Sequence, residues 1–295
     1  MRPRVRPRVR LCYRRAMAHP TGRPPLRKAL GQHHLTDGGL CRPLVDFLRP
    51  AGSPVVEVGP GGGVLTRELL AAGADPVLAW ELDPAWAAEL ARRAQRWGAS
   101  DRLRLVVGDA VEIPWHRMPS GTLVAGNLPY NVATRILLRL APAWERIPRA
   151  GFLVQKEVAD RLVAGPGDSA YGGLSVLVAA YARVRRLARV QRGSFHPPPK
   201  VDGAFVGLEL HRPPLPEGSM PSLVRTVHLA FGQRRKTLVN ALAAGLGTDG
   251  KAKARTMVAS AGLAPKVRAE ALGLDELVAL WKAGSDAKML DFNDV

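Results

Sequence analysis

The chain has 295 residues, 46% of them hydrophobic, and 43 Lys and Arg against 25 Asp and Glu give it a formal net charge of +18. This length is enough for a full α/β domain and a smaller second unit. The charge favours a polyanionic partner, with nucleic acid as the first candidate. No apolar stretch approaches the roughly 20 residues of a membrane span, so we expect a cytoplasmic protein without membrane contact.

The first 30 residues are strongly basic, with nine Arg, one Lys and no acid. From Arg2 to Arg10 the charges alternate with Pro and Val, a pattern that disfavours a helix. We therefore expect residues 1–26 to be a disordered basic extension. Three interpretations of this extension compete: an RNA-contacting arm, an organelle transit peptide, and a translated leader upstream of a start at Met17. The leader is favoured, and the transit peptide is disfavoured because residues 1–20 lack Ser.

The chain holds two cysteines, Cys12 and Cys41. They lack the spacing of metal ligands, and they lie among Arg and Leu residues. We expect free thiols in a reducing compartment, no metal site and a monomeric protein.

Short apolar, β-branched runs predict buried strands at 55–58, 77–80, 103–107, 123–125, 151–154 and 204–210. Helical patterns lie between them at 65–70, 85–97 and 132–140. Strands that alternate with helices are joined by parallel crossovers. The sequence therefore predicts a doubly wound, mostly parallel α/β sheet over residues 27–212.

Residues 195–200 contain three prolines and are expected to be extended. After residue 212 the pattern changes to helices only, with candidates at 222–231, 234–246, 253–261 and 275–283. We expect residues 213–295 to form a smaller all-helical domain.

A glycine-rich segment, residues 57–63 (EVGPGGG), follows the first predicted strand and precedes a helix. Glycines at this position let a ligand approach the backbone closely. A dinucleotide fingerprint counted from Gly59 would need glycine at position 64, where Val64 stands. The segment disfavours a nicotinamide or flavin enzyme, and a purely structural turn remains an alternative.

Acidic residues stand at the ends of the next two strands, Glu81 and Asp109. A carboxylate at the end of the second strand accepts hydrogen bonds from the hydroxyls of a ribose. The carboxyl ends of parallel strands converge on one crevice. Glu81, Asp109 and the glycine-rich segment therefore predict a pocket for a nucleoside.

The fourth predicted strand ends in Asn127-Leu128-Pro129-Tyr130. The side-chain oxygen of Asn127 and a backbone carbonyl held by Pro129 can accept the two protons of an adenine amine, and Tyr130 offers a ring for stacking. These contacts would aim the nitrogen lone pair at a methyl donor, and the proton can leave after transfer. A turn with a packed Tyr is the alternative.

In their order along the chain, these residues resemble the ribosomal RNA adenine dimethyltransferase family. The resemblance covers residues 27 to 246 and rests on 31–35 (GQHHL), 57–63, 81–83 (ELD), 109–110, 127–130, 195–201 and 231–238. It implies a Rossmann-like methyltransferase domain over 27–212 and an RNA-binding helical domain over 213–295. The implied substrate is a pair of adjacent adenosines near the 3′ end of small-subunit rRNA, each dimethylated at N6 during ribosome assembly.

The resemblance also implies roles for single residues. S-adenosylmethionine would be held by His33, Leu35, Gly59, Gly61, Glu81, Asp109 and Asn127, with Glu81 on the ribose and Asp109 on the adenine. Asn127, Leu128, Pro129 and Tyr130 would position the target adenine, and Phe195 would close its other face.

The sequence departs from the family at His34, where an apolar or aromatic residue is usual. An imidazole adds polarity and possible charge near the sulfonium, which would weaken cofactor binding if it were protonated. Gly62 replaces a larger residue, and we expect only local loosening from it.

A basic cluster, Gln233-Arg234-Arg235-Lys236, is predicted to open a helix and to contact rRNA phosphates together with Lys200. The same surface is extended by Lys156, Arg161, Arg183, Arg185, Arg186, Arg189 and Arg192. For any one of these residues, a solvated surface charge is an equal alternative.

The sequence leaves three alternative functions. The first is a related enzyme that methylates large-subunit rRNA and confers antibiotic resistance, which residues 231–238 and the proline-rich link disfavour. The second is a ribosome assembly factor that binds RNA without catalysis, for which His34 is the only hint. The third, a DNA adenine methyltransferase, would typically carry a second proline after Asn127.

Overall fold

The computed structural model describes residues 24–26, 32–128 and 132–287. Residues 1–23 of the expected basic extension, with Cys12 and Met17, lie outside the described residues. So do Pro129 and Tyr130 of the predicted site.

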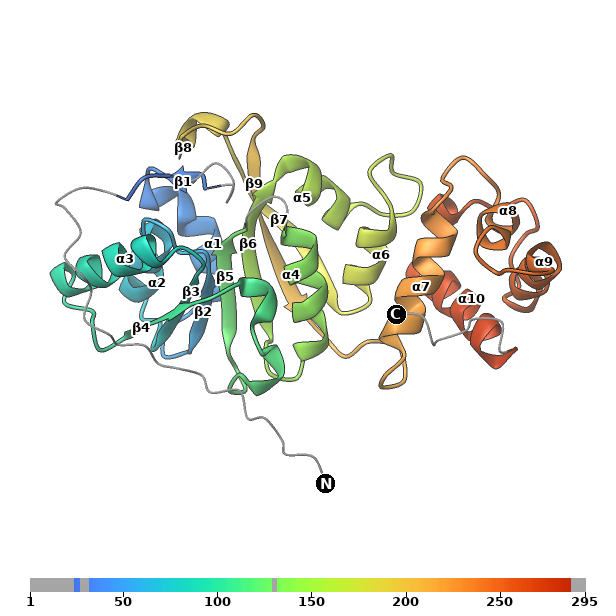
Figure 1. The fold of residues 1–295 in the computed structure, drawn as a ribbon, viewed down its shortest axis with the longest axis horizontal. Coiled ribbons are helices and arrows are strands. Elements are labelled where there is room, and N and C mark those ends of the chain that lie inside the picture. The colour runs from blue at the N-terminus through green and yellow to red at the C-terminus, as the bar shows by residue number, and fades with distance from the viewer. Residues whose placement is uncertain (1–23, 27–31, 129–131, 288–295) are drawn as a thin grey trace, which may run out of the picture.

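A seven-stranded sheet forms the centre of the molecule (Figure 1). The strands lie in the order β4-β3-β2-β5-β6-β9-β7, parallel from β4 to β6, with β9 antiparallel to both β6 and β7. Their bounds are β2 (Val55–Val58), β3 (Val77–Glu81), β4 (Leu103–Val107), β5 (Leu123–Asn127), β6 (Arg149–Gln155), β7 (Ala182–Val190) and β9 (Gly203–Leu210). The predicted doubly wound, mostly parallel sheet is confirmed, and β7 is the strand that was not predicted.

Helices cover both faces of this sheet (Figure 1). Every residue of β2 is buried, as expected for a parallel strand between two helical layers. One layer is α1 (Arg42–Leu48), α2 (Val64–Ala71) and α3 (Pro84–Arg96), and the other is α4 (Ala133–Leu140), α5 (Lys156–Val163) and α6 (Gly173–Ala179). The start of α3 is well specified, because Asp83 caps it by accepting a bond from the Ala85 amide and Pro84 occupies its first turn.

Beyond α6 in Figure 1, the described residues after β9 form helices and no strand: α7 (Met220–Phe231), α8 (Leu238–Ala243), α9 (Gly250–Ser260) and α10 (Leu274–Asp286). Their apolar core also takes in α6 and the buried ring of Tyr171, whose hydroxyl donates to the Leu272 carbonyl at 2.7 Å. The proposed boundary at residue 212 falls between β9 and α7, in a segment without regular structure. The helical part therefore shares its core with the layer beneath it.

The basic cluster does not open a helix, so that prediction was wrong. Residues 232–236 form turns, closed by a bond from the Lys236 amide to the Gln233 carbonyl at 2.9 Å. Thr237 is extended, and α8 starts only at Leu238, whose amide bonds to the Val267 carbonyl at 2.7 Å. The cluster consequently lies on an exposed loop between α7 and α8.

A second, two-stranded sheet joins distant parts of the chain. β1 (His34–Leu35) pairs antiparallel with β8 (Phe195–His196), so that His34 faces His196 and Leu35 faces Phe195. The Thr36 amide extends this ladder to the Ser194 carbonyl at 3.0 Å. The segment predicted to be extended thus holds residues 34–36 in place.

Two further observations concern the described residues alone. None of the described helices has both the length and the apolar character needed to cross a membrane. Nowhere in the same ranges do three or more His, Cys, Asp or Glu gather as they would around a metal ion. Cys41 is a buried free thiol, and its burial raises its pKa to about 12.

Candidate active site

The predicted cofactor residues gather at one edge of the sheet, where the parallel strands β2 to β5 end. The Gly59 amide donates to the Trp80 carbonyl, and the Gly108 amide donates to the Glu81 carbonyl, each at 2.9 Å. These bonds continue the strand pairing past the ends of β2 and β4. They place the glycine-rich segment, Glu81 and Asp109 side by side, as predicted for a crevice at the carboxyl ends.

Glu81 is buried, and its carboxylate is oriented by two backbone amides. Gly61 donates to Oε2 at 3.0 Å and Asp83 donates to Oε1 at 2.9 Å. Burial raises the pKa of Glu81, and the bonds from these amides partly offset that rise. A carboxylate oxygen accepts more than one hydrogen bond, so this group can still receive the hydroxyls of a ligand.

The glycine loop, which we define as residues 59–63, needs glycine at specific positions. Gly59, Gly61 and Gly63 have φ of 66°, 49° and 77°, a left-handed region that other residues rarely adopt. At Gly61 a β-carbon would also lie 2.6 Å from Nε2 of His34. The His34 side chain therefore lies against this loop.

A small hollow of about 30 Å³ lies beneath the loop, lined by His34, Leu35, Glu57, Gly59, Pro60, Gly62, Val64, Leu65 and Asn127. Of the predicted cofactor residues, Leu35, Gly59 and Asn127 meet here. The hollow has room for about one water molecule. The loop or residues 34–35 would have to shift before a nucleoside-sized ligand could enter it.

Glu57 was not predicted as a site residue, yet it lines this hollow. It is 1% exposed, and its Oε2 has no hydrogen-bond partner among the described residues. Burial raises its pKa to about 8, the nearby Glu81 charge adds to the rise, and Thr66 partly offsets it. The one signal in the sequence was an acid within an otherwise apolar strand next to the glycines.

Asn127 ends β5 with a defined orientation, because its side-chain Nδ2 donates to the His33 carbonyl at 2.8 Å. This bond uses the donor side of the amide and leaves Oδ1 as an acceptor. Leu128 is buried in the core, and its amide donates to the Leu153 carbonyl at 3.0 Å. Only the main chain of Leu128 is therefore placed to take part in a site.

Three other predicted site residues, Asp109, Phe195 and His33, do not line the hollow. Asp109 is exposed, and its Oδ1 accepts from the Val111 amide at 2.9 Å, which caps a short 3-10 helix. Phe195 is 4% exposed and packs in the core beside Gly203. The Nδ1 atom of His33 lies 2.8 Å from the Pro197 carbonyl. These contacts position the three residues but do not bring Phe195 to a surface.

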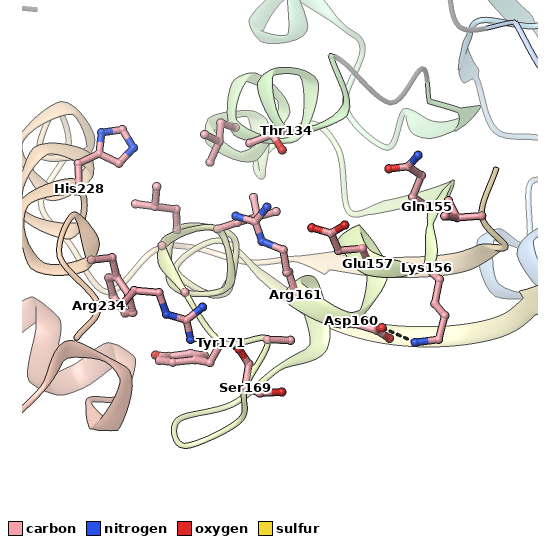
Figure 2. A pocket seen from close by; sticks show the side chains of 18 of the residues that line it. Thr134, Gln155, Lys156, Glu157, Asp160, Arg161, Ser169, Tyr171, His228 and Arg234 are labelled. Carbon is pink, nitrogen blue, oxygen red and sulfur yellow. Dashed lines mark hydrogen bonds and ion pairs between the residues drawn. The ribbon is translucent and has the colours of Figure 1, made fainter. Parts of the chain in front are cut away.

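A much larger cleft, of about 1400 Å³, lies between the sheet layer and the C-terminal helices. Figure 2 shows Arg161 and Glu157 of α5 reaching into it, with Thr134 of α4 and His228 of α7 on facing walls. Asn127 pairs with Leu153 of β6, and Gln155, the last residue of β6, lines this cleft. Its volume exceeds the range typical of small-molecule sites.

The cleft is lined by more cations than anions: Lys156, Arg161, Arg192, Lys200 and Arg234 against Glu157, Asp160 and Asp202. Two of the three acids are already paired, Asp160 with Lys156 and Arg186 and Asp202 with Arg189. A hydrogen bond from Lys156 lowers the pKa of Asp160, so this acid stays charged. No ion pair of Arg161 is found in the described ranges, although its side chain lines the cleft.

The residues predicted to bind RNA divide into two groups. Lys200 and Arg234 line the cleft, whereas Arg235 and Lys236 are exposed on the α7–α8 loop beside it. Arg234 also donates to the Ser169 carbonyl at 3.1 Å and lies 3.6 Å from Glu270. It therefore ties the loop to its surroundings as well as contributing charge.

Most of the chain matches the model of one protein family. The family model described as ribosomal RNA adenine dimethylase matches residues 25–280. The chain belongs to this family. Its motifs thus lie in the part of the chain that the family shares.

Relatives in sequence share the chain over most of its length. A protein of Methylococcus capsulatus named ribosomal RNA small subunit methyltransferase A is 43% identical over 257 residues, which are 86% of this chain and 96% of that protein. A protein of the same name from Streptomyces coelicolor is 42% identical over 84% of this chain and 87% of its own length.

Solved structures confirm the fold. A dimethyladenosine transferase from Plasmodium falciparum has a TM-score of 0.72 at 23% identity, covering 87% of this chain and 98% of its own. The 23S rRNA methyltransferase ErmE has a TM-score of 0.62 at 24% identity, covering 84% and 98%. Both share the class I methyltransferase fold with this chain, whose own C-terminal region is helical.

Proposed function

We propose that the protein transfers methyl groups from S-adenosylmethionine to the N6 amines of adjacent adenosines near the 3′ end of small-subunit rRNA. It acts as a monomer in the cytoplasm during ribosome assembly. The supporting observation is the orientation of Asn127 at the end of β5, between the glycine loop and the large cleft. Relatives that share most of the chain are named for methylation of small-subunit rRNA.

The residues at the sheet edge fit S-adenosylmethionine. The oriented carboxylate of Glu81 would hold the ribose, and the exposed Asp109 would hold the adenine. The buried Oε2 of Glu57, which has no hydrogen-bond partner in the described part of the chain, would accept a bond from the ammonium group of the cofactor. His33, Leu35, Gly59 and Gly61 complete the set. When bound, S-adenosylmethionine supplies an activated methyl group.

Asn127 would position the target amine. Its Nδ2 is held by the His33 carbonyl, so Oδ1 can accept a proton of the adenine amine. That bond keeps the amine lone pair directed at the cofactor side, and positioning of this kind replaces a strong base. The backbone carbonyls of Leu128 and Pro129 and the rings of Tyr130 and Phe195 would complete the adenine site. For Phe195 this needs its ring to leave the core.

The cleft would hold the RNA on either side of the target adenosine. Its excess of cations over anions suits phosphates. Contacts of this kind fix orientation rather than sequence. We assign this role to Arg161, Lys200, Arg234, Arg235 and Lys236, with residues 213–295 as the RNA-binding domain.

The test is transfer of labelled methyl from S-adenosylmethionine to small ribosomal subunits that lack the modification. Large subunits and an Asn127→Ala variant are assayed in parallel. We expect label in small subunits only, lost in the variant. Label in large subunits would favour a resistance enzyme instead. Binding of small subunits without transfer would favour an assembly factor.

A further inference from the structure

A side-chain hydrogen bond joins the glycine loop to α3. Arg93 donates from Nη1 to the Gly62 carbonyl at 2.5 Å and from Nε to Oε1 of Glu89 at 2.8 Å. Glu89 is 8% exposed and lies one turn before Arg93 on the same helix. Because a guanidinium is planar and is held at two of its nitrogens, Arg93 has one defined position. The Gly62 carbonyl is thereby fixed relative to α3.

Arg92 offers a natural comparison. It also bonds to Glu89, through Nη2 and Nε to Oε2 at 2.8 and 3.1 Å. Its side chain is 42% exposed against 18% for Arg93. No bond from Arg92 to the loop is found among the described residues. The two arginines thus share their acid and differ in their contact with Gly62.

The same glycine is covered by His34. A β-carbon on Gly62 would lie 3.3 Å from Nδ1 of His34 and 3.6 Å from Nη1 of Arg93. The His34 ring packs edge-on against Trp86 of α3, with centroids 4.4 Å apart and planes at 76°. His34 itself is held by its pairing with His196. The loop is therefore enclosed by α3 and β1 together.

The position of the loop matters for the carboxylate that would bind the ribose. Gly61 donates its amide to Glu81, and Gly62 is the next residue. A shift of the Gly62 carbonyl would move the Gly61 amide and release one oxygen of Glu81. We infer that Arg93 is a positioning residue for S-adenosylmethionine, acting through Gly62 and supported by His34. This inference rests on the proposed function only for the identity of the cofactor.

The first test compares Arg93→Ala with Arg92→Ala in the full chain. The dissociation constant for S-adenosylmethionine is measured by titration calorimetry. Loss of a hydrogen bond to a charged group predicts about a tenfold weaker affinity for Arg93→Ala, against less than twofold for Arg92→Ala. Arg93→Lys should recover part of the loss, since an ammonium can still donate to Gly62. Equal affinities in the two alanine variants would overturn the inference.

The second test needs no cofactor. Hydrogen–deuterium exchange of the amides of residues 59–64 should be faster in Arg93→Ala than in Arg92→Ala, while exchange in β5 stays the same in both. Equal exchange in the loop would contradict the inference even if both variants fold. Failure of the wild type to methylate small subunits would overturn the proposed function and leave this comparison valid. The proposed function and the inference about Arg93 can therefore be contradicted independently of each other.

Discussion

Asn127 and His33, which are 94 residues apart in the sequence, are joined by a 2.8 Å bond from the side-chain amide to the backbone carbonyl. The same His33 contacts the Pro197 carbonyl through its ring. One short segment thus connects the strand end that would present the target amine with the proline-rich link. The orientation of Asn127 depends on this connection.

The first prediction concerns that bond. In Asn127→Asp the donor is replaced by a second oxygen, which is repelled by the His33 carbonyl. Displacement of a positioning group by about 1 Å costs roughly a hundredfold in rate. We expect kcat to fall by that order, with unchanged binding of small subunits. Asn240→Asp, at an exposed position of α8, is the control. A wild-type kcat in Asn127→Asp would contradict the assignment.

The second prediction follows from Glu57, whose pKa of about 8 lies above the ordinary 4.5. Between these values the folded state binds more protons than the unfolded state, so stability falls as the pH rises through this window. Glu57→Gln removes the titration. We expect the wild type to lose on the order of a few kcal/mol relative to this variant between about pH 5 and pH 8.

Urea unfolding at both pH values measures this difference. Glu112→Gln is the control, because the Glu112 side chain is 73% exposed. Parallel pH dependence in the wild type and Glu57→Gln would show that Glu57 is ionised in the folded protein.

The third prediction concerns Gly126, which lets β5 and β2 approach. A β-carbon there would lie 2.5 Å from the backbone oxygen of Val58. Overpacking against a backbone atom costs about 1–3 kcal/mol, so Gly126→Ala should lower the free energy of unfolding by that amount. Gly193→Ala, where a β-carbon meets nothing within 4 Å, should leave it unchanged. Equal stability of both variants would show that the strands can separate without cost.

The fourth prediction tests the cleft. Arg161 reaches into it, whereas Arg186 lies on the outer strand β7, paired with Asp160. We expect Arg161→Ala to weaken binding to small subunits and to reduce the slope of log affinity against log salt by about one. Arg186→Ala should change the slope less, because this charge is already neutralised. A larger effect of Arg186 would place the RNA on the outer strand instead.

Much of the fold could be predicted, because buried parallel strands consist of apolar residues in short runs. The strand β7 was not predicted, because its apolar pattern is interrupted by Arg183, Arg185, Arg186 and Arg189. At the edge of the sheet such residues find partners in Glu209, Asp160 and Asp202. The start of α8 at Leu238 was not predicted either, because it depends on a hydrogen bond to Val267, which is distant in the sequence.

The placement of Glu81 and Asn127 was predictable, because each is the last residue of a parallel strand. Glu57 was missed because its proposed role depends on burial and on an oxygen that has no partner among the residues the structure describes. Arg93 was missed because one more arginine in a helix gives no sign that it reaches Gly62. Contacts between elements far apart in the chain decide both cases.

The most direct test of the central claim is nucleoside analysis of small-subunit rRNA after incubation with the protein and S-adenosylmethionine. The rRNA is cut into fragments, digested and examined by mass spectrometry. We predict N6,N6-dimethyladenosine at two adjacent positions in the 3′ fragment alone. Methyl groups on another base, or only in fragments away from the 3′ end, would contradict the account.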